Sequence, residues 1–198
     1  IAPADKKIYA LRDASGTVES IPLIVASIMS KKLALKSDGI VFDVKSGSGA
    51  FMKSTRDALK LAKTLLDVSN EYKLPARALI TNMNEPTGRM IGNYLEIMET
   101  VEVLKGSGPA DTVELTLELG ASMLAVSGVE TSRSTAMRSM KTALRSGSAY
   151  ESWCRYISAC GGNIKIFEHP ERMMKPAHKA IVKSPKSGYI SAIDAGKL

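Results

Sequence analysis

One stretch of the sequence decides the fold: Asp43-Val44-Lys45-Ser46-Gly47-Ser48-Gly49-Ala50-Phe51-Met52-Lys53. The apolar run Ile40–Phe42 leads into it, and a helix signal begins at Ser54. The order strand, glycine loop, helix is typical of α/β proteins, which build ligand sites at the carboxyl ends of their strands. Successive backbone N–H groups in Gly47–Gly49 are candidates for binding an anion, and a tight turn is the alternative. The loop matches neither GxGxxG nor GxxxxGK[ST], so it carries no nucleotide fingerprint.

The periodicity of apolar residues predicts the other elements of the chain. Strands are expected at 6–11, 39–45 and 76–81, and helices from about residues 20, 54, 90, 111, 136 and 150. Two short β-like pieces are expected at 180–182 and 189–191. Strands that alternate with helices predict an α/β fold, with a central, mostly parallel (mixed) sheet flanked by helices.

Composition excludes several classes of protein. The net charge is +7, but the basic residues are dispersed and aromatic residues make up only 5%, so nucleic-acid binding is not expected. No apolar run reaches the roughly 18 residues that a membrane span needs, and residues 1–5 lack the features of a signal peptide and an initiator Met. Cys154 and Cys160 form no CxxC pattern, which favours reduced thiols in a cytoplasmic protein. The sequence is therefore expected to be a processed or partial cytoplasmic chain.

Arg12, Ser27 and Lys31 form the first candidate site. Ser27 and Lys31 are four residues apart, so they share one face of the predicted helix, at the edge of its apolar stripe. Arg12 follows the strand predicted at 6–11 and is placed to reach the same cleft. Two cations and a hydroxyl suit a ligand whose carbonyl oxygens gain negative charge. The alternative is a solvated Arg and Lys beside an ordinary helix Ser.

Three further sets of polar residues have side chains that could carry chemistry. Asp43 and Lys45 are expected on opposite faces of their strand, in a structural ion pair or a catalytic role. Glu99, close to the carbonyl-rich loop 87–90, has the chemistry to hold a cation. His169 and His178 are too isolated for a catalytic pair or a zinc site.

Four segments in this order resemble the thymidine and pyrimidine-nucleoside phosphorylase family. They are Asp5–Asp13, Thr17–Lys32, Asp43–Lys53 and Met83–Asn93, the last followed by Glu96 and Glu99. Four matched segments in order are far more specific than any one of them, and their order and spacing match the family over nearly the whole chain.

The resemblance implies a pentosyltransferase that converts a pyrimidine nucleoside and phosphate into the free base and a pentose 1-phosphate. Arg12, Ser27 and Lys31 match the family's pyrimidine-binding positions, with Arg12 and Lys31 also implied to be catalytic. Phosphate is the co-substrate, and neither a redox cofactor nor a catalytic metal is required. A potassium ion is implied at Thr87, Met90 and Glu99. The parent protein is expected to be a cytoplasmic homodimer.

Family analogy also implies domain boundaries. Residues 1–34 complete a small helical domain, residues 38–170 form most of the α/β domain, and residues 175–198 begin a C-terminal domain of α/β type.

The family's phosphate-binding Lys-His-Ser segment is not found in this sequence, so this fragment alone is expected to be inactive. A phosphoribosyltransferase of similar architecture remains an alternative reading, as does a non-catalytic base-binding or dimerisation module. The residues present do not decide between uridine and thymidine.

Overall fold

The computed structural model describes residues 2–168 and 178–198. It confirms an α/β protein, with seven α-helices, two β-strands and one short 3-10 helix in the described part of the chain. Contacts divide the chain into two units. Unit 1 comprises Ile1–Glu85, Leu119–Ala136 and Asp194–Leu198, and unit 2 comprises Pro86–Glu118 and Met137–Ile193.

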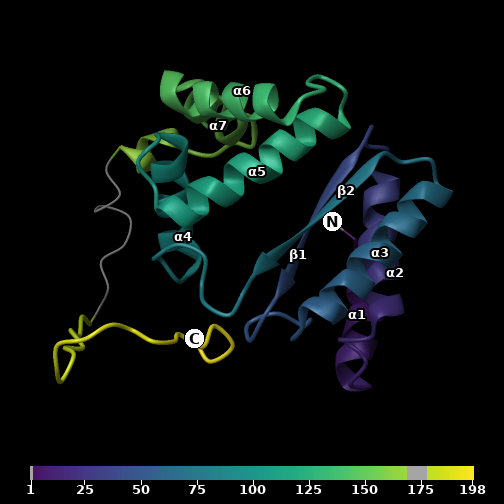
Figure 1. Cartoon of the computed structure of the whole chain (residues 1–198), viewed down its shortest axis with the longest axis horizontal. Helices are drawn as coiled ribbons and strands as arrows, with labels where there is room; N and C mark the ends of the chain where they lie inside the picture. Colours follow the sequence, from purple (N-terminus) through teal and green to yellow (C-terminus); the bar gives the residue numbers. More distant parts are fainter. Residues whose placement is uncertain (1, 169–177) are drawn as a thin grey trace. The chain divides into compact units, whose positions relative to one another are not determined.

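The sheet of unit 1 consists of two parallel strands, β1 (Ile40–Ser46) and β2 (Ala76–Asn82). Helix α3 (Thr55–Glu71) connects them and packs on them (Figure 1). This parallel pair with a helical crossover is the βαβ unit that the sequence predicts. The buried core of unit 1 is apolar. Its side chains come from α3, β1, the loop after β1 and the helix at residues 21–34. They are Ile24, Val25, Met29, Phe42, Val44, Met52, Ala58, Leu61, Ala62 and Leu65.

Helix α3 begins where its capping signal predicts. The Ser54 hydroxyl oxygen accepts a hydrogen bond of 3.1 Å from the Asp57 backbone N–H, and the same hydroxyl donates to the Asp57 carboxylate at 2.6 Å. The first bond satisfies one of the N–H groups that the start of a helix leaves without an intrahelical partner.

Helix α2 (Ile21–Ala34) also begins close to the predicted residue, with Ser20 at the N-cap and a proline in the first turn. Proline has no N–H to lose at that position, which is why a helix tolerates it there. Three of its apolar residues, Ile24, Val25 and Met29, are buried in the core of unit 1.

The strand predicted at 6–11 is wrong, because these residues belong to helix α1 (Pro3–Ala14). Three features explain the helix. Pro3 stands in its first turn, Asp5 adds negative charge near its N-terminus, and Arg12 adds positive charge in its last turn. The apolar run at 8–11 is too short to outweigh these signals.

The regular elements in the described part of unit 2 are all helices. Unit 2 contains α4 (Asn93–Leu104), the first half of α5 (Ala110–Val126), most of α6 (Arg133–Ser146), α7 (Ser148–Ala159) and the 3-10 helix η1 (Ile164–Phe167). Lys105 lies over the Tyr150 ring at 4.5 Å, and the rings of Trp153 and Phe167 are 6.0 Å apart. Helix α5 confirms the helix predicted from about residue 111.

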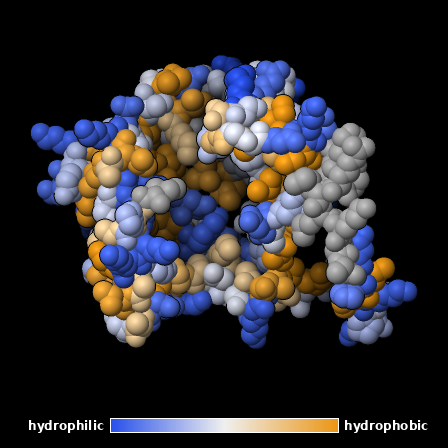
Figure 2. Space-filling model, turned by 180° about the vertical axis from the view of Figure 1, so that it is seen from behind, coloured by the Kyte–Doolittle hydropathy of each residue, from blue (hydrophilic) through white to orange (hydrophobic). Residues whose placement is uncertain are grey.

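The β-like pieces predicted at 180–182 and 189–191 form no strand in the structure. Their side chains are exposed, including Val182 and Tyr189, and no other described segment pairs with them. Apolar residues also reach the surface elsewhere, as separate orange areas among hydrophilic ones in Figure 2. None of the helices in the described residues is both long and apolar enough to cross a membrane.

Candidate functional site

Arg12 is a buried cation, only 5% exposed, at the end of α1. Its guanidinium donates to the backbone carbonyls of Val18 and Leu23 and lies 4.9 Å from the centre of the Tyr9 ring. Its Nε, in contrast, is buried without a hydrogen-bond partner among the described residues. A buried donor without a partner costs free energy, so its retention points to a ligand that accepts from it.

Ser27 and Lys31 meet a third residue, Asp5 of α1, in a closed triangle of hydrogen bonds. The Lys31 ammonium donates to Asp5 at 2.6 Å and to the Ser27 oxygen at 2.8 Å, while the Ser27 hydroxyl donates to the other Asp5 oxygen at 2.7 Å. Hydrogen bonds from Lys31 and then from Ser27 hold the pKa of Asp5 below its ordinary value of 3.8. Asp5 is therefore a carboxylate at neutral pH and a fixed counter-charge for Lys31.

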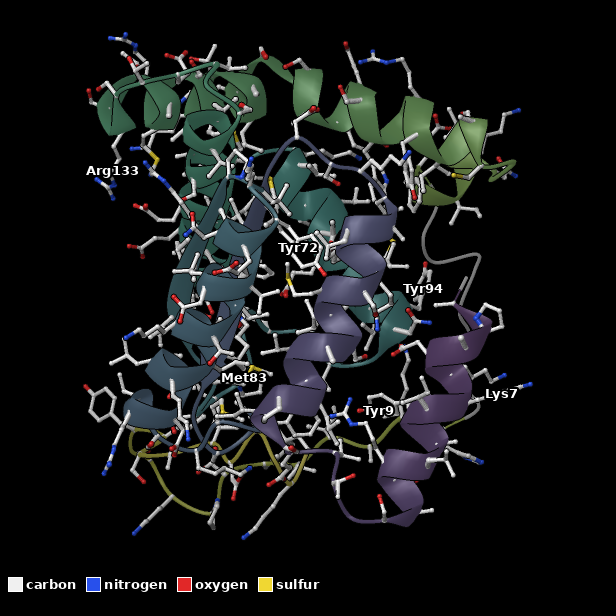
Figure 3. All side chains as sticks on the ribbon, turned by 90° about the vertical axis from the view of Figure 1, so that its right-hand side faces the viewer. Lys7, Tyr9, Tyr72, Met83, Tyr94 and Arg133 are labelled. Carbon is white, nitrogen blue, oxygen red and sulfur yellow. The ribbon has the colours of Figure 1, made fainter. Side chains whose placement is uncertain are left out.

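A cavity of about 860 Å³ in unit 1 brings the predicted residues together. Arg12, Ser27 and Lys31 all line it, and Tyr9 lines it from the side of α1 that faces α2 (Figure 3). Most of the remaining lining is apolar. A volume in this range, with a few polar groups in apolar surroundings, is typical of small-molecule sites.

The sequence reading missed Asp5 and Tyr9 because it placed residues 6–11 on a strand. In the helix, Asp5, Tyr9 and Arg12 follow one another at spacings of four and three residues, so they occupy one face. The proline at residue 3 with an acid two residues later was the available signal, since that pair is typical of a helix start.

The glycine loop does not offer a free anion nest. The N–H groups of Gly47, Gly49 and Ala50 donate to backbone carbonyls, and the Ser48 N–H donates to the Asn84 side chain. A Cβ on Gly47 would lie 2.5 Å from the Asn84 backbone nitrogen, and Gly47 has a φ of +139°. The loop therefore requires glycine for its backbone geometry, and the tight-turn interpretation is the one the structure supports.

Asp43 and Lys45 lie on the same face of β1, so the expectation of opposite faces is wrong. Residues two apart in a strand point to the same side, because successive side chains alternate. Their side chains form an ion pair of 2.9 Å, and Asp43 also accepts from the Thr81 hydroxyl. Both charged groups therefore have structural partners at the edge of the cavity that they line.

Glu99 of α4 is a buried acid in unit 2, only 5% exposed. One of its oxygens accepts from the Arg89 N–H at 2.9 Å, and the other lies 1.9 Å from where a Cβ on Gly88 would stand. The Thr112 hydroxyl oxygen lies 2.9 Å from the same Cβ position and is buried without a partner among the described residues. Two oxygens therefore converge on a space that only glycine at 88 leaves open.

Two histidines and two cysteines are the remaining candidates. His178 is exposed, and His169 lies outside the described residues. Cys154 and Cys160 are both free thiols. In the described part of the chain, no three His, Cys, Asp or Glu side chains gather as a metal-binding group.

The parallel strand pair defines an α/β protein, and the cavity lined by Arg12 and Lys31 is its candidate site for a small ligand rich in acceptors. The family model "Glycosyl transferase family, a/b domain" matches residues 1–150. The chain therefore belongs to this glycosyl transferase family.

Several similar proteins carry the name pyrimidine-nucleoside phosphorylase. Those from Staphylococcus aureus strains USA300, NCTC 8325 and COL are each 45% identical to the chain over 193 residues, or 98% of its length. The same alignment covers 45% of each relative. The chain thus spans about half the length of the curated relatives it matches.

Proposed function

We propose that this chain forms the base-binding part of a pyrimidine-nucleoside phosphorylase. The observation that carries the proposal is the buried guanidinium of Arg12, whose Nε has no partner among the described residues and which lines one cavity with Lys31. The similarity to Staphylococcus aureus proteins of that name supports the same reaction.

In the proposed reaction, the bond between sugar and base breaks as phosphate takes the sugar. The base leaves with the bonding electrons, so negative charge develops on its ring and carbonyl oxygens. Arg12 and Lys31 are positively charged and face the cavity, where they stabilise this charge more strongly in the transition state than in the bound nucleoside. Ser27 orients the base through its hydroxyl oxygen.

Phosphate is the proposed co-substrate, but its binding residues are not assigned to this chain. The loop 47–50 already uses its N–H groups internally, and the family's Lys-His-Ser segment is not found in the sequence. We therefore propose that the 198-residue chain binds the base but does not catalyse phosphorolysis by itself. Release of pentose 1-phosphate from uridine and phosphate by this chain would contradict that statement.

Calorimetry with uracil and thymine tests the base-binding role directly. The chain is expected to bind both bases, and an absence of binding would argue against the proposal.

The products of the reaction separate a phosphorylase from the two alternatives, a phosphoribosyltransferase and a non-catalytic binding module. Incubation of the active enzyme with uridine and phosphate yields uracil only if it is a phosphorylase. A phosphoribosyltransferase would instead need a phosphoribosyl diphosphate, and a binding module would give no product with either.

A potassium ion is proposed in unit 2 beside Glu99, Thr112 and Gly88. The convergence of a Glu99 oxygen and the unpartnered Thr112 hydroxyl near Gly88 fits a cation with oxygen ligands, to which Thr87 and Met90 would add backbone carbonyls. Bound there, the ion would supply positive charge that holds the loop 87–90 to α4. Its proposed role is structural and adds no step to the reaction.

The domain boundaries, the homodimer of the parent protein and the cytoplasmic location also stay predictions. Size-exclusion chromatography of the active enzyme with light scattering would test the dimer.

A further inference from the structure

We infer that Asp5 is a positioning residue that turns Ser27 into a hydrogen-bond acceptor and so makes the site select an imide, the chemical group shared by uracil and thymine. The inference rests on the proposed function, because it concerns which pyrimidine the cavity accepts. It follows from the directions of the three hydrogen bonds in the Asp5 triangle.

The chemistry of the three groups fixes these directions. An ammonium can only donate, so the contact of 2.8 Å between Lys31 and Ser27 makes the Ser27 oxygen an acceptor. An ionised carboxylate can only accept, so the contact of 2.7 Å between Ser27 and Asp5 takes the single hydroxyl proton. Ser27 then has one lone pair left and no proton for a ligand. It can accept from a base N–H but cannot donate to a base nitrogen.

Donors flank Ser27 on both sides. The Leu23 carbonyl, which binds the Arg12 guanidinium, belongs to the residue one turn before Ser27 on α2, and Lys31 is one turn after it. Lys31 has a third N–H beyond the two that bond Asp5 and Ser27, and Arg12 has its unpartnered Nε. The site therefore presents a donor, an acceptor and a donor in a row.

This row complements an imide and not cytosine. The edge of uracil or thymine carries a carbonyl, an N–H and a carbonyl, so the central N–H meets the Ser27 lone pair. Cytosine has a bare ring nitrogen at the centre, which would face the same lone pair without a proton between them. Leaving buried polar groups unpaired is what makes such a site reject the wrong ligand.

Asp5 acts through its hydrogen bonds to Ser27 and Lys31 and not through contact with the ligand. Ser27 and Lys31 line the cavity, but Asp5 is not among its described lining residues. Its side chain is 21% exposed. Asp5 therefore touches no substrate and works through the two residues that do.

Asp5→Asn tests the inference with almost no change in volume. Lys31, as the charged donor, takes the amide oxygen of the new side chain, and the amide N–H₂ then donates to Ser27. Both Ser27 lone pairs are then occupied, and its proton turns toward the ligand. Calorimetry on the full chain, with uracil and cytosine as probes, should show at least about hundredfold preference for uracil in the unmodified protein and about tenfold or less in Asp5→Asn.

Two further variants separate positioning from simple destabilisation. Asp13→Asn removes an exposed carboxylate from the same helix and should keep the preference of the unmodified chain. Asp5→Glu keeps a carboxylate and should restore much of the preference that Asp5→Asn loses. Thermal unfolding of each variant reports stability, which a merely structural role would change without changing the ratio of the two affinities.

The outcomes distinguish this inference from the proposed function. Failure of the unmodified chain to bind uracil would contradict both. Uracil binding with the same preference in Asp5→Asn as in the unmodified chain would contradict the role of Asp5 alone. A collapse of the preference in Asp5→Asn, with Asp13→Asn unaffected, would support it.

Discussion

The glycine loop 46–52 and the helix pair α1 and α2 use their polar groups in opposite ways. The loop is conspicuous in the sequence, yet its N–H groups at 47–50 all donate to protein atoms. The helix pair is inconspicuous, yet it retains an unpartnered Nε on a buried Arg12 and a remaining N–H on Lys31 beside a cavity. Gly47 thus marks a constrained backbone, and the unsatisfied donors of the helix pair are the groups that the proposed function assigns to a ligand. Changes in the two regions should accordingly affect different properties.

The largest effect is expected from Lys31→Ala in the helix pair. In the proposed mechanism, loss of the ammonium removes charge stabilisation from the departing base, so kcat/KM of the active enzyme for uridine or thymidine should fall by about a hundredfold or more. That corresponds to roughly 3 kcal/mol of transition-state stabilisation. Steady-state kinetics measure it.

The matched control for this change is Lys7→Ala. Lys7 is exposed on α1 and points away from α2 (Figure 3), so its loss removes the same charge without touching the cavity. A kcat/KM that stays the same in Lys31→Ala, or that falls equally in Lys7→Ala, would contradict the role assigned to Lys31.

The next effect is on stability, in the loop. Gly47→Ala places a Cβ 2.5 Å from the Asn84 backbone nitrogen at a φ of +139°, so the backbone must shift. Unfolding in urea should show a loss of about 2–3 kcal/mol, while the folded variant still binds uracil.

Gly16→Ala is the control for the backbone term. Gly16 has a φ of +66°, but a Cβ there would meet nothing within 4 Å. It should lose only about 1 kcal/mol, the cost of a left-handed residue alone. Equal losses at the two glycines would show that the close approach to Asn84 is unimportant.

A smaller loss is expected where the loop gives way to α3. Ser54→Ala removes the capping bond to the Asp57 N–H and should cost about 1 kcal/mol of unfolding free energy, with base binding unchanged. Ser20 holds the same N-cap position on α2 but makes no capping bond with its side chain, so Ser20→Ala should change stability little. If urea unfolding gives the same result for both, the capping bond contributes nothing measurable.

The helices α3 and α1 differ in how far the sequence predicts them. Elements with long periodic patterns or explicit end signals, such as α3 with its Ser54 cap, were predicted within a few residues. Helix α1 differs from the predicted strand because its start signal, Pro3 with Asp5, lies before the apolar run on which the strand prediction rests, and the helix brings Asp5, Tyr9 and Arg12 onto one face. The short apolar run at 8–11 is compatible with a strand as well as with a helix.

For the candidate site, the sequence predicts the contact within helix α2 but not the contact between the two helices. The i, i+4 spacing correctly brought Ser27 and Lys31 together, because that relation is local to one helix. Their contact with Asp5 spans more than twenty residues of sequence, and no local spacing rule reaches so far. The residue that fixes the direction of the Ser27 hydroxyl was therefore visible only in the folded chain.

The smallest effect expected is a pH dependence of stability from Asp5. Lys31 and Ser27 lower its pKa in the folded chain below 3.8, so the folded state binds the proton less readily than the unfolded chain does. The resulting stabilisation is fully present above the unfolded pKa and is lost as the pH falls through the folded pKa. Urea unfolding should find the unmodified protein more stable than Asp5→Asn at pH 6, with the difference shrinking as the pH drops below 3.8. The pair is partly exposed, so high salt should also weaken the difference. A difference that persisted unchanged at pH 3 would mean that packing, and not charge, is the reason that Asp5 stabilises the folded chain. The helix pair would then be held by steric constraints, as the loop 46–52 is.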